Sequence, residues 1–267
     1  MGYSPVSVSP IHDASQLKEI VRDRWNIRER VEGWIGSDLN AEFEDPACRE
    51  AWKRALCRAV TGTRPGDALD IGTGPGTIAE LWAELGYAAT GLDISPAMLD
   101  AARLRAAEKR QATRYLEGDA ESPPFLRKRF DVISSRFVLY TLPRPGYALR
   151  RWVSLLRPGG ALVLIGHDRQ EGPKPPQRPP APAARWQDER HREAMSRLPF
   201  MNHTSTDLLV VMEAAGLCEI ERVPTEELVA ARNTLRVRRT PVGLQQDTPF
   251  ILVGRKGCMR TERSTRR

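Results

Sequence analysis

The chain has 267 residues, of which 40% are hydrophobic and 28% are charged, a composition that suits a globular protein able to bury a core without disulfides. Its net charge of +7 would favour a nucleic-acid partner if it covered one face of the fold. Residues 255–267, however, carry six Lys or Arg and one Glu, so most of the excess belongs to the C-terminus. We therefore expect no nucleic-acid partner and a disordered basic tail at 257–267.

Targeting signals and cysteine spacing indicate the compartment. The four cysteines, Cys48, Cys57, Cys218 and Cys258, form no CxxC pair and no metal-ligand spacing. The N-terminus has no apolar signal region, and no apolar run approaches the ~20 residues of a membrane span. We expect a cytoplasmic protein with free thiols and no membrane partner, and we leave a homodimer open.

The first 65 residues are predicted to form a helical cap. Residues 14–33 carry an apolar stripe that includes Leu17, Ile20 and Val21, and residues 46–62 repeat the spacing of three and four. Both segments therefore read as helices.

From residue 66 onward, short apolar segments alternate with helical ones. Strands are predicted at 68–72, 88–94, 114–119, 130–136, 161–166, 217–223 and 248–254. Ser95 followed by Pro96 is a strong helix start after the second strand. This alternation predicts an α/β doubly wound sheet with right-handed crossovers.

The second half of this domain, which we bound at 66–256, contains an insertion at 167–204. RPGG at 157–160 reads as a turn before the fifth strand, and residues 173–182 hold six prolines, which favour a stiff extended spacer. A helix is expected at 185–197. Another is expected to be capped by Ser205 and to end at Gly216.

A glycine-rich turn follows the first predicted strand. Asp70 ends that strand, and Gly72, Gly74 and Gly76 come at alternating positions before a helix. Glycines allow the backbone to bend tightly and to approach a ligand, and the helix N-terminus directs free N–H groups at an anion. A dinucleotide site would read G-x-G-x-x-G, whereas here Thr77 takes the third glycine position.

The G-x-G-x-G turn with Asp70 resembles motif I of the class I S-adenosylmethionine (SAM)-dependent methyltransferases. Four further segments resemble that family in order and spacing: GLDIS ending at Ser95, GDAESPPF at 118–125, FDVISSRFVLYTLPRP at 130–145, and RPGGALVLIG at 157–166. The resemblance implies a Rossmann-like seven-stranded sheet, mostly parallel with the last strand antiparallel, and helical cap insertions. It also implies SAM as the cofactor.

The resemblance assigns roles to particular residues. Asp93 would accept hydrogen bonds from the ribose hydroxyls, Asp119 would face the adenine amine, and the glycine turn would hold the methionine carboxylate. Trp25 and Arg28, on a helix that covers the cofactor in similar enzymes, would assist, with Arg28 pairing with the carboxylate. The predicted cofactor-binding residues are Asp70, Gly72, Thr73, Gly74, Gly76, Asp93, Ile94, Met98, Asp119, Ala120, Arg136, Phe137, Arg28 and Trp25.

Candidate catalytic residues lie at the ends of the fourth and fifth strands. Tyr140 and Phe137 could place an aromatic face near the sulfonium, and His167 with Asp168 could act as base or substrate anchor. His203 is a further candidate within the insertion. Asp168 has no neighbouring carboxylate in the sequence, so no metal is expected.

The predicted function is methyl transfer to a small molecule, with secondary metabolism as one setting. Three alternatives stay open: a SAM user that cyclises SAM or only binds it, a macromolecule methyltransferase that uses the basic tail, and a nicotinamide oxidoreductase. Water must be kept from the sulfonium, so the N-terminal helix and residues 167–204 are predicted to close over the cofactor.

Overall fold

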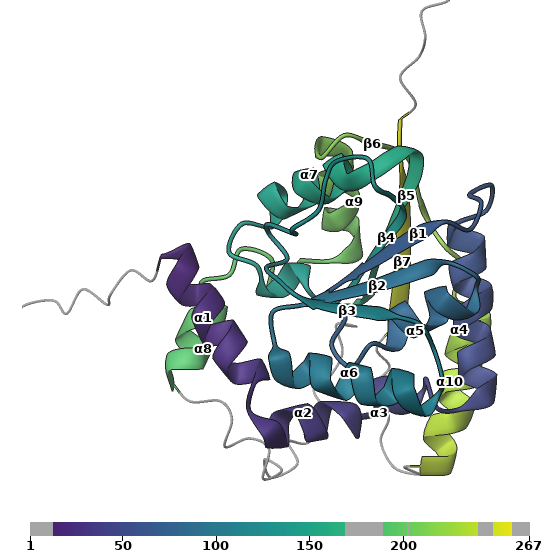
Figure 1. Ribbon diagram of the computed structural model, residues 1–267, viewed down its shortest axis with the longest axis horizontal. Coiled ribbons are helices and arrows are strands. Elements are labelled where there is room, and N and C mark those ends of the chain that lie inside the picture. The colour runs from purple at the N-terminus through teal and green to yellow at the C-terminus, as the bar shows by residue number, and fades with distance from the viewer. Residues whose placement is uncertain (1–12, 169–188, 202, 240–247, 258–267) are drawn as a thin grey trace, which may run out of the picture.

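The computed structural model describes residues 13–168, 189–201, 203–239 and 248–257, and Figure 1 shows a central sheet with helices on both sides. The strands are β1 (Asp67–Ile71), β2 (Ala88–Asp93), β3 (Arg114–Glu117), β4 (Phe130–Arg136), β5 (Leu156–Asp168), β6 (Leu217–Arg222) and β7 (Thr248–Lys256). They form one sheet in the order β3-β2-β1-β4-β5-β7-β6.

The sheet has the direction pattern that the sequence predicts. β1 pairs in parallel with β2 and β4, and β4 pairs in parallel with β5. β7 is antiparallel to both β5 and β6. The Rossmann-like doubly wound fold is therefore confirmed, and its parallel strands place their carboxyl ends along one edge.

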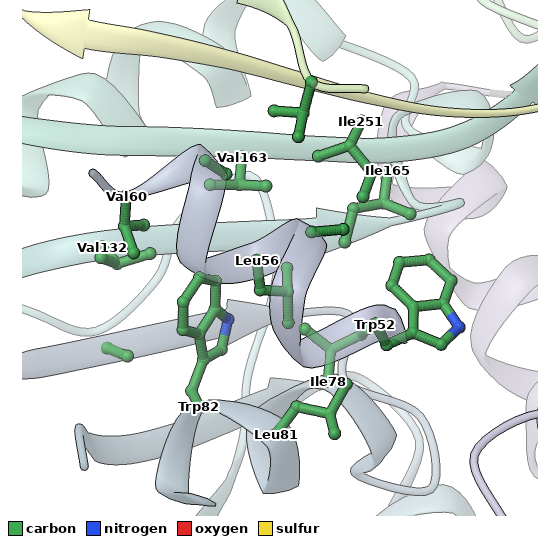
Figure 2. Close-up of a cluster of buried hydrophobic side chains, with 14 of the residues drawn as sticks. Trp52, Leu56, Val60, Ile78, Leu81, Trp82, Val132, Val163, Ile165 and Ile251 are labelled. Atoms are coloured by element: carbon green, nitrogen blue, oxygen red, sulfur yellow. The ribbon is translucent and has the colours of Figure 1, made fainter. Parts of the chain in front are cut away.

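Two hydrophobic layers cover the sheet. On one face pack α4 (Pro46–Ala59), α5 (Thr77–Glu84) and α10 (Glu226–Arg239), and Figure 2 shows Trp52, Leu56 and Trp82 against Val163 and Ile251. The other face is covered by α7 (Pro145–Leu155) and α9 (Ser205–Ala214). Further helices are α6 (Pro96–Glu108), beside β3, and α8 (Glu189–Ser196).

The prediction of one continuous helix at 14–33 in the N-terminal segment is wrong. Two helices form instead, α1 (Ala14–Trp25) and α2 (Arg28–Ile35), followed by the short α3 (Asp38–Ala41). The break has a tertiary cause, because the Asn26 side chain accepts from Ser95 Oγ at 2.9 Å, and Ser95 Oγ also lies 2.9 Å from the Trp25 carbonyl oxygen. The chain thus docks on the start of α6.

The predictions around α4 and α10 had different outcomes. Asp45 caps α4 by accepting from the Cys48 N–H at 2.9 Å, Pro46 takes the first position, and the helix ends at Ala59 rather than at residue 62. No helix was predicted at α10, although it packs along α4, where Glu227 pairs with Arg54 and Arg58.

Two further boundaries differ from the sequence predictions. Residues 157–160 are not a separate turn but part of β5, where the register with β4 shifts between the Phe130–Leu156 and Val132–Ala161 pairs. Helix α9 is capped by Thr204, in a capping box with Asp207, rather than by Ser205. Ser205 is instead bound by Asp168, as described below.

Some predictions fall on parts of the chain that the structure does not describe. The proline-rich segment 173–182 and all of the basic tail except Gly257 lie outside the described residues. Within the described ranges, no helix combines the length and apolar character needed to cross a membrane.

Candidate active site

A cavity with about 800 Å³ of empty volume, part of it open to solvent, lies at the carboxyl ends of β1 to β4. Its lining comprises Lys18, Val21, Trp25, Trp34, Gly72, Gly74, Leu92, Asp93, Ile94, Met98, Gly118, Asp119, Ala120, Arg136, Phe137, Val138, Thr141 and Leu142. Four segments far apart in the sequence therefore meet at one site.

The glycine turn between β1 and α5 needs its glycines for backbone reasons. Gly72 has φ 68°, and a Cβ atom there would collide with the side chain of Val138. Gly76 has φ 82°, and a Cβ atom there would collide with the hydroxyl of Tyr115. Gly72 and Gly74 line the cavity, whereas Gly76 shapes the turn against β3.

Asp93 connects the glycine turn to the end of β2. Its carboxylate accepts from the Gly74 N–H at 2.8 Å and from the Ser95 N–H at 2.9 Å. Burial raises its pKa, although the hydrogen bonds from backbone N–H groups act in the opposite direction. The side chain lines the cavity and so presents acceptor oxygens where vicinal hydroxyls could bind.

Asp70 lies beneath the cavity rather than in its lining. It is only 2% exposed and accepts from Ser134 Oγ at 2.7 Å, and Ser134 in turn accepts from the Trp82 indole at 2.9 Å. Burial raises the pKa of Asp70 to about 6. Thr73, which is also buried, donates its backbone N–H to the Leu92 carbonyl. Both residues support the glycine turn from behind.

The segment after β3 forms another wall. Asp119 and Ala120 line the cavity, and the Ala120 carbonyl accepts from the Trp152 indole at 2.7 Å. Asp119 also accepts from the Glu121 N–H at 2.8 Å, which fixes the turn. Ile94 and Met98 add apolar surface from the β2–α6 connection.

Three aromatic rings from different elements enclose the cavity. Trp25 and Trp34 meet edge-on with their centroids 5.5 Å apart, and Trp34 meets Phe137 in the same way at 6.3 Å. Phe137 has φ 63°, a conformation that costs energy for a bulky residue and is held here at the end of β4. Aromatic faces of this kind suit a cation.

Arg136, rather than Arg28, is the guanidinium at the cavity. Arg28 is 87% exposed, pairs with Glu32 at 2.8 Å, and is not among the described lining residues, so the structure gives the predicted carboxylate contact no support. Arg136 lines the cavity and donates to Asn40 at 3.1 Å. Burial lowers its pKa to about 10, so it stays positively charged at neutral pH.

The three predicted catalytic residues do not belong to the described lining of the cavity. Asp168 accepts from the Ser205 N–H at 2.8 Å and lies 3.4 Å from Arg222, so it fixes the start of α9. Tyr140 lies in a short 3-10 helix (Leu139–Thr141) that is followed by lining residue Leu142. The structure therefore gives no direct support to their catalytic roles.

His167 lies behind Phe137, with the two ring centroids 5.1 Å apart. Its Nε2 is 3.1 Å from the guanidinium of Arg232, which also contacts the buried Glu42 at 2.6 Å. Burial, together with the positive charges of Arg232, Arg136 and Arg236, lowers the pKa of His167 to about 3. The imidazole is therefore neutral and a weak base at physiological pH.

Sequence reasoning missed several lining residues, including Lys18, Val21, Trp34, Val138, Thr141 and Leu142. Val138, Thr141 and Leu142 belong to the fourth-strand segment at 130–145, so the resemblance of that whole segment was the signal that could have found them. Lys18, Val21 and Trp34 lie in the N-terminal helices, where amphipathic spacing alone does not distinguish a core face from a ligand face.

A family model described as a methyltransferase domain matches residues 69–164. A demethylmenaquinone methyltransferase of Tropheryma whipplei (strain Twist) is 38% identical over 122 residues, 45% of this chain and 50% of the relative. A malonyl-[acyl-carrier protein] O-methyltransferase of Pseudescherichia vulneris is 36% identical over 102 residues, 38% and 39% of the two chains. The chain thus spans half or less of the length of these relatives.

Solved structures support the same fold. The Haemonchus contortus phosphoethanolamine N-methyltransferase 2 in complex with SAM has a TM-score of 0.57 at 17% identity, over 86% of this chain and 60% of that one. The [4+2]-cyclase SpnF has a TM-score of 0.54 at 18% identity, over 77% and 80%. The matched family model therefore identifies a methyltransferase domain at residues 69–164, and the sheet order and the glycine turn around it resemble the class I SAM-dependent methyltransferases.

Proposed function

We propose that the protein transfers a methyl group from SAM to an O, N or C nucleophile of a small molecule. The observation that carries this proposal is the meeting of Gly72, Gly74, Asp93 and Asp119 on one cavity at the carboxyl ends of three neighbouring parallel strands. Because a nucleoside with a charged amino-acid tail needs separate partners for its ribose, base and tail, these residues fit SAM.

Each part of the cavity suits one part of that cofactor. Asp93 offers carboxylate oxygens to the ribose hydroxyls, and Asp119 offers an acceptor to the adenine amine beside apolar Ile94 and Met98. The carboxylate of the amino-acid tail would take backbone N–H groups of the glycine turn and the charge of Arg136. In this proposal Arg136 takes the role first given to Arg28.

The chain's own contribution to the chemistry is placement and exclusion of water. When bound, SAM supplies a methyl carbon that takes the acceptor's electron pair while the pair of the carbon–sulfur bond returns to sulfur. Trp25, Trp34 and Phe137 provide a dry aromatic enclosure for the positive charge. None of His167, Tyr140 and Asp168 is assigned as a base, so we propose an acceptor whose nucleophile is already basic.

The N-terminal helices form a cap in this proposal. Lys18, Val21 and Trp25 of α1 and Trp34 of α2 line the cavity, so the cap supplies one wall of it. Helix α1 also contacts α8, which falls within the predicted insertion at 167–204, and Figure 1 shows these two helices side by side. We propose that they close over the bound cofactor.

A small-molecule acceptor and a cytoplasmic location are part of the same proposal. The curated relatives are named for demethylmenaquinone and malonyl-[acyl-carrier protein], neither of which is a nucleic acid. Cys48, Cys57 and Cys218 are free thiols, as expected in a reducing compartment.

Calorimetry on the full chain tests the cofactor assignment. S-adenosylhomocysteine (SAH) should bind with 1:1 stoichiometry, and NAD⁺ should show no heat of binding at the same concentrations. Incubation with SAM alone, followed by mass spectrometry, should leave SAM intact. Conversion of SAM without an acceptor would instead indicate a reaction of SAM with itself and overturn methyl transfer as the function.

A further inference from the structure

A second cavity adjoins the first. The two share Val21, Trp25 and Thr141 in their linings, so these three residues border both cavities. The second has about 1310 Å³ of empty volume, part of it open to solvent, compared with about 800 Å³ for the first. It extends from α1 and α2 to α8 and the residues that follow α8.

One wall of the second cavity is apolar and adaptable. Met195, Leu198 and Met201 line it together with Val21. Leu198 belongs to a small cluster with Leu17 and Ile20 of α1, and Met195 and Met201 pack against that cluster. Thioether side chains adjust to irregular apolar ligands, so this wall suits the hydrocarbon part of a small molecule.

The other wall is positively charged. Arg24, Arg30 and Arg192 line the cavity, and none of the described lining residues is Asp or Glu. The Arg30 guanidinium lies over the Trp25 ring, 4.3 Å from its centroid, and its Nε atom is buried without a hydrogen-bond partner. This stacking presents the guanidinium beside the boundary with the first cavity.

Arg30 is held in this position at an energetic cost. Its burial and the positive charge of Arg24 lower the pKa of Arg30 to about 10, so the group remains charged at neutral pH. Arg24 and Arg30 repel one another, and a partly buried cation of this kind is stabilised when an anion binds. A carboxylate or phosphate also matches the planar fork of a guanidinium.

We propose that the second cavity binds the methyl acceptor, and that this acceptor is a small amphipathic molecule with an anionic group held by Arg30, Arg24 and Arg192. Its apolar part lies against Met195, Leu198 and Met201, and its nucleophile points past Trp25 and Thr141 toward the first cavity. This inference rests on the proposed function, because it assigns the substrate class of the same reaction.

Three matched probes test the charge requirement: 2-naphthoate, 2-naphthyl phosphate and the neutral 2-naphthamide, titrated into the full chain by calorimetry with and without saturating SAH. At least one anionic probe should bind about tenfold or more tightly than the amide, because charge-assisted hydrogen bonds to guanidinium are the strong ones. The preferred anion then distinguishes a carboxylate from a phosphate acceptor.

Arg30→Met should reduce the preference for the anion while changing the affinity for the amide less than about twofold. Arg103→Met is the matched control, because Arg103 is an exposed arginine paired with Asp100 on α6, away from both cavities. It loses the same unit of charge and should bind all three probes as the wild type does.

The outcomes separate the two proposals. Equal binding of anion and amide to the wild type, or an unchanged preference in Arg30→Met, would overturn the anionic acceptor even if SAH binds. Absence of SAH binding would overturn the proposed function, and the titrations without SAH would still decide whether the second cavity selects anions.

Discussion

Lys18 of α1 donates a 2.7 Å hydrogen bond to Asp119, which follows β3 and lines the first cavity. The same ammonium lies 2.6 Å from Glu121, whose side chain is fully buried. Burial alone would lower the pKa of Lys18, but the two carboxylates raise it above its usual value. The cap helix is therefore tied to the segment proposed to hold adenine.

Replacing Lys18 with methionine should loosen the cap. The variant leaves Glu121 with Arg144 alone and should lose about 1–2 kcal/mol of unfolding free energy, between the values for surface and buried ion pairs. With SAH bound, amides of residues 14–25 should exchange faster than in the wild type, as hydrogen exchange with mass spectrometry will measure. Lys53→Met, which removes a lysine paired with Glu50, is the control and should behave as the wild type does.

Ligand binding provides the complementary test of the cap. In the wild type, SAH should slow exchange of amides in 14–25, because the helix supplies lining residues Lys18, Val21 and Trp25. Identical exchange with and without SAH would contradict a cap that closes, while leaving the cofactor assignment intact.

Asp93→Asn should weaken SAH binding about tenfold or more, because charged acceptors for the ribose hydroxyls are worth about 1.5–3 kcal/mol each. Calorimetry measures the affinity. Asn keeps the size of the side chain and one acceptor for the Gly74 N–H, so the loop is disturbed as little as possible. Asp100→Asn, an exposed carboxylate on α6, should have no effect. An unchanged affinity for Asp93→Asn would remove the ribose role.

Arg136→Met should weaken the binding of SAM more than the binding of decarboxylated SAM. Only SAM has the carboxylate that the guanidinium would bind, so the ratio of the two affinities should fall by about tenfold. Measuring both ligands on one variant cancels any loss of folded protein. Arg28→Ala should leave the ratio unchanged, because Arg28 pairs with Glu32 in solvent. A ratio that changes for Arg28→Ala alone would restore the original assignment.

His167 should make stability depend on pH in acid. The pKa of His167 is lowered from its ordinary 6.5 to about 3, so between these values the unfolded chain binds a proton that the folded chain does not. Stability from this group is therefore present above about pH 6.5 and is lost as the pH falls. From pH 7 to pH 5 the wild type should lose up to about 2 kcal/mol more than His167→Gln in urea unfolding. Equal losses would show that His167 is solvated.

Asp168→Asn should affect stability rather than cofactor binding. The carboxylate receives the Ser205 N–H and lies near Arg222, so its neutralisation should cost about 1–3 kcal/mol of unfolding free energy. SAH affinity should stay within about twofold of the wild type, because Asp168 is absent from the described cavity lining. A larger loss of affinity at full folding would return Asp168 to the active site.

The segments with local signals could be predicted from the sequence. Strand β4 matches its predicted range of 130–136, and Ser95 caps α6 by binding the Met98 N–H, as the Ser-Pro pair predicts. Gly72 and Asp93 could be placed at a site because strand ends of a parallel sheet meet at one edge. These features depend on neighbouring residues in the chain, so periodicity and turn chemistry contain them.

Longer-range partners could not be predicted in this way. Arg28 was predicted to pair with the carboxylate and Arg136 only to contact the cofactor, but the fold exposes the first and buries the second beside the cavity. Helix α10 gave no recognisable motif, yet it brings Arg232 to Glu42 and His167, residues far from it in sequence. Electrostatic roles depend on burial, and burial depends on which elements pack together.

The sequence by itself determined the sheet, the glycine turn and the acid at the end of β2, because each requires particular residue types at short spacing. Only the tertiary structure decided that Trp25, Trp34 and Phe137 enclose one cavity and that Arg30 stacks on Trp25 beside a second. The contact between Trp34 and Phe137 joins the cap to a strand end more than a hundred residues away in the sequence. The contact between Arg30 and Trp25 depends on how two side chains of neighbouring helices are turned. Helical spacing is the same for a ligand-facing stripe and a core-facing one, so packing alone distinguishes them.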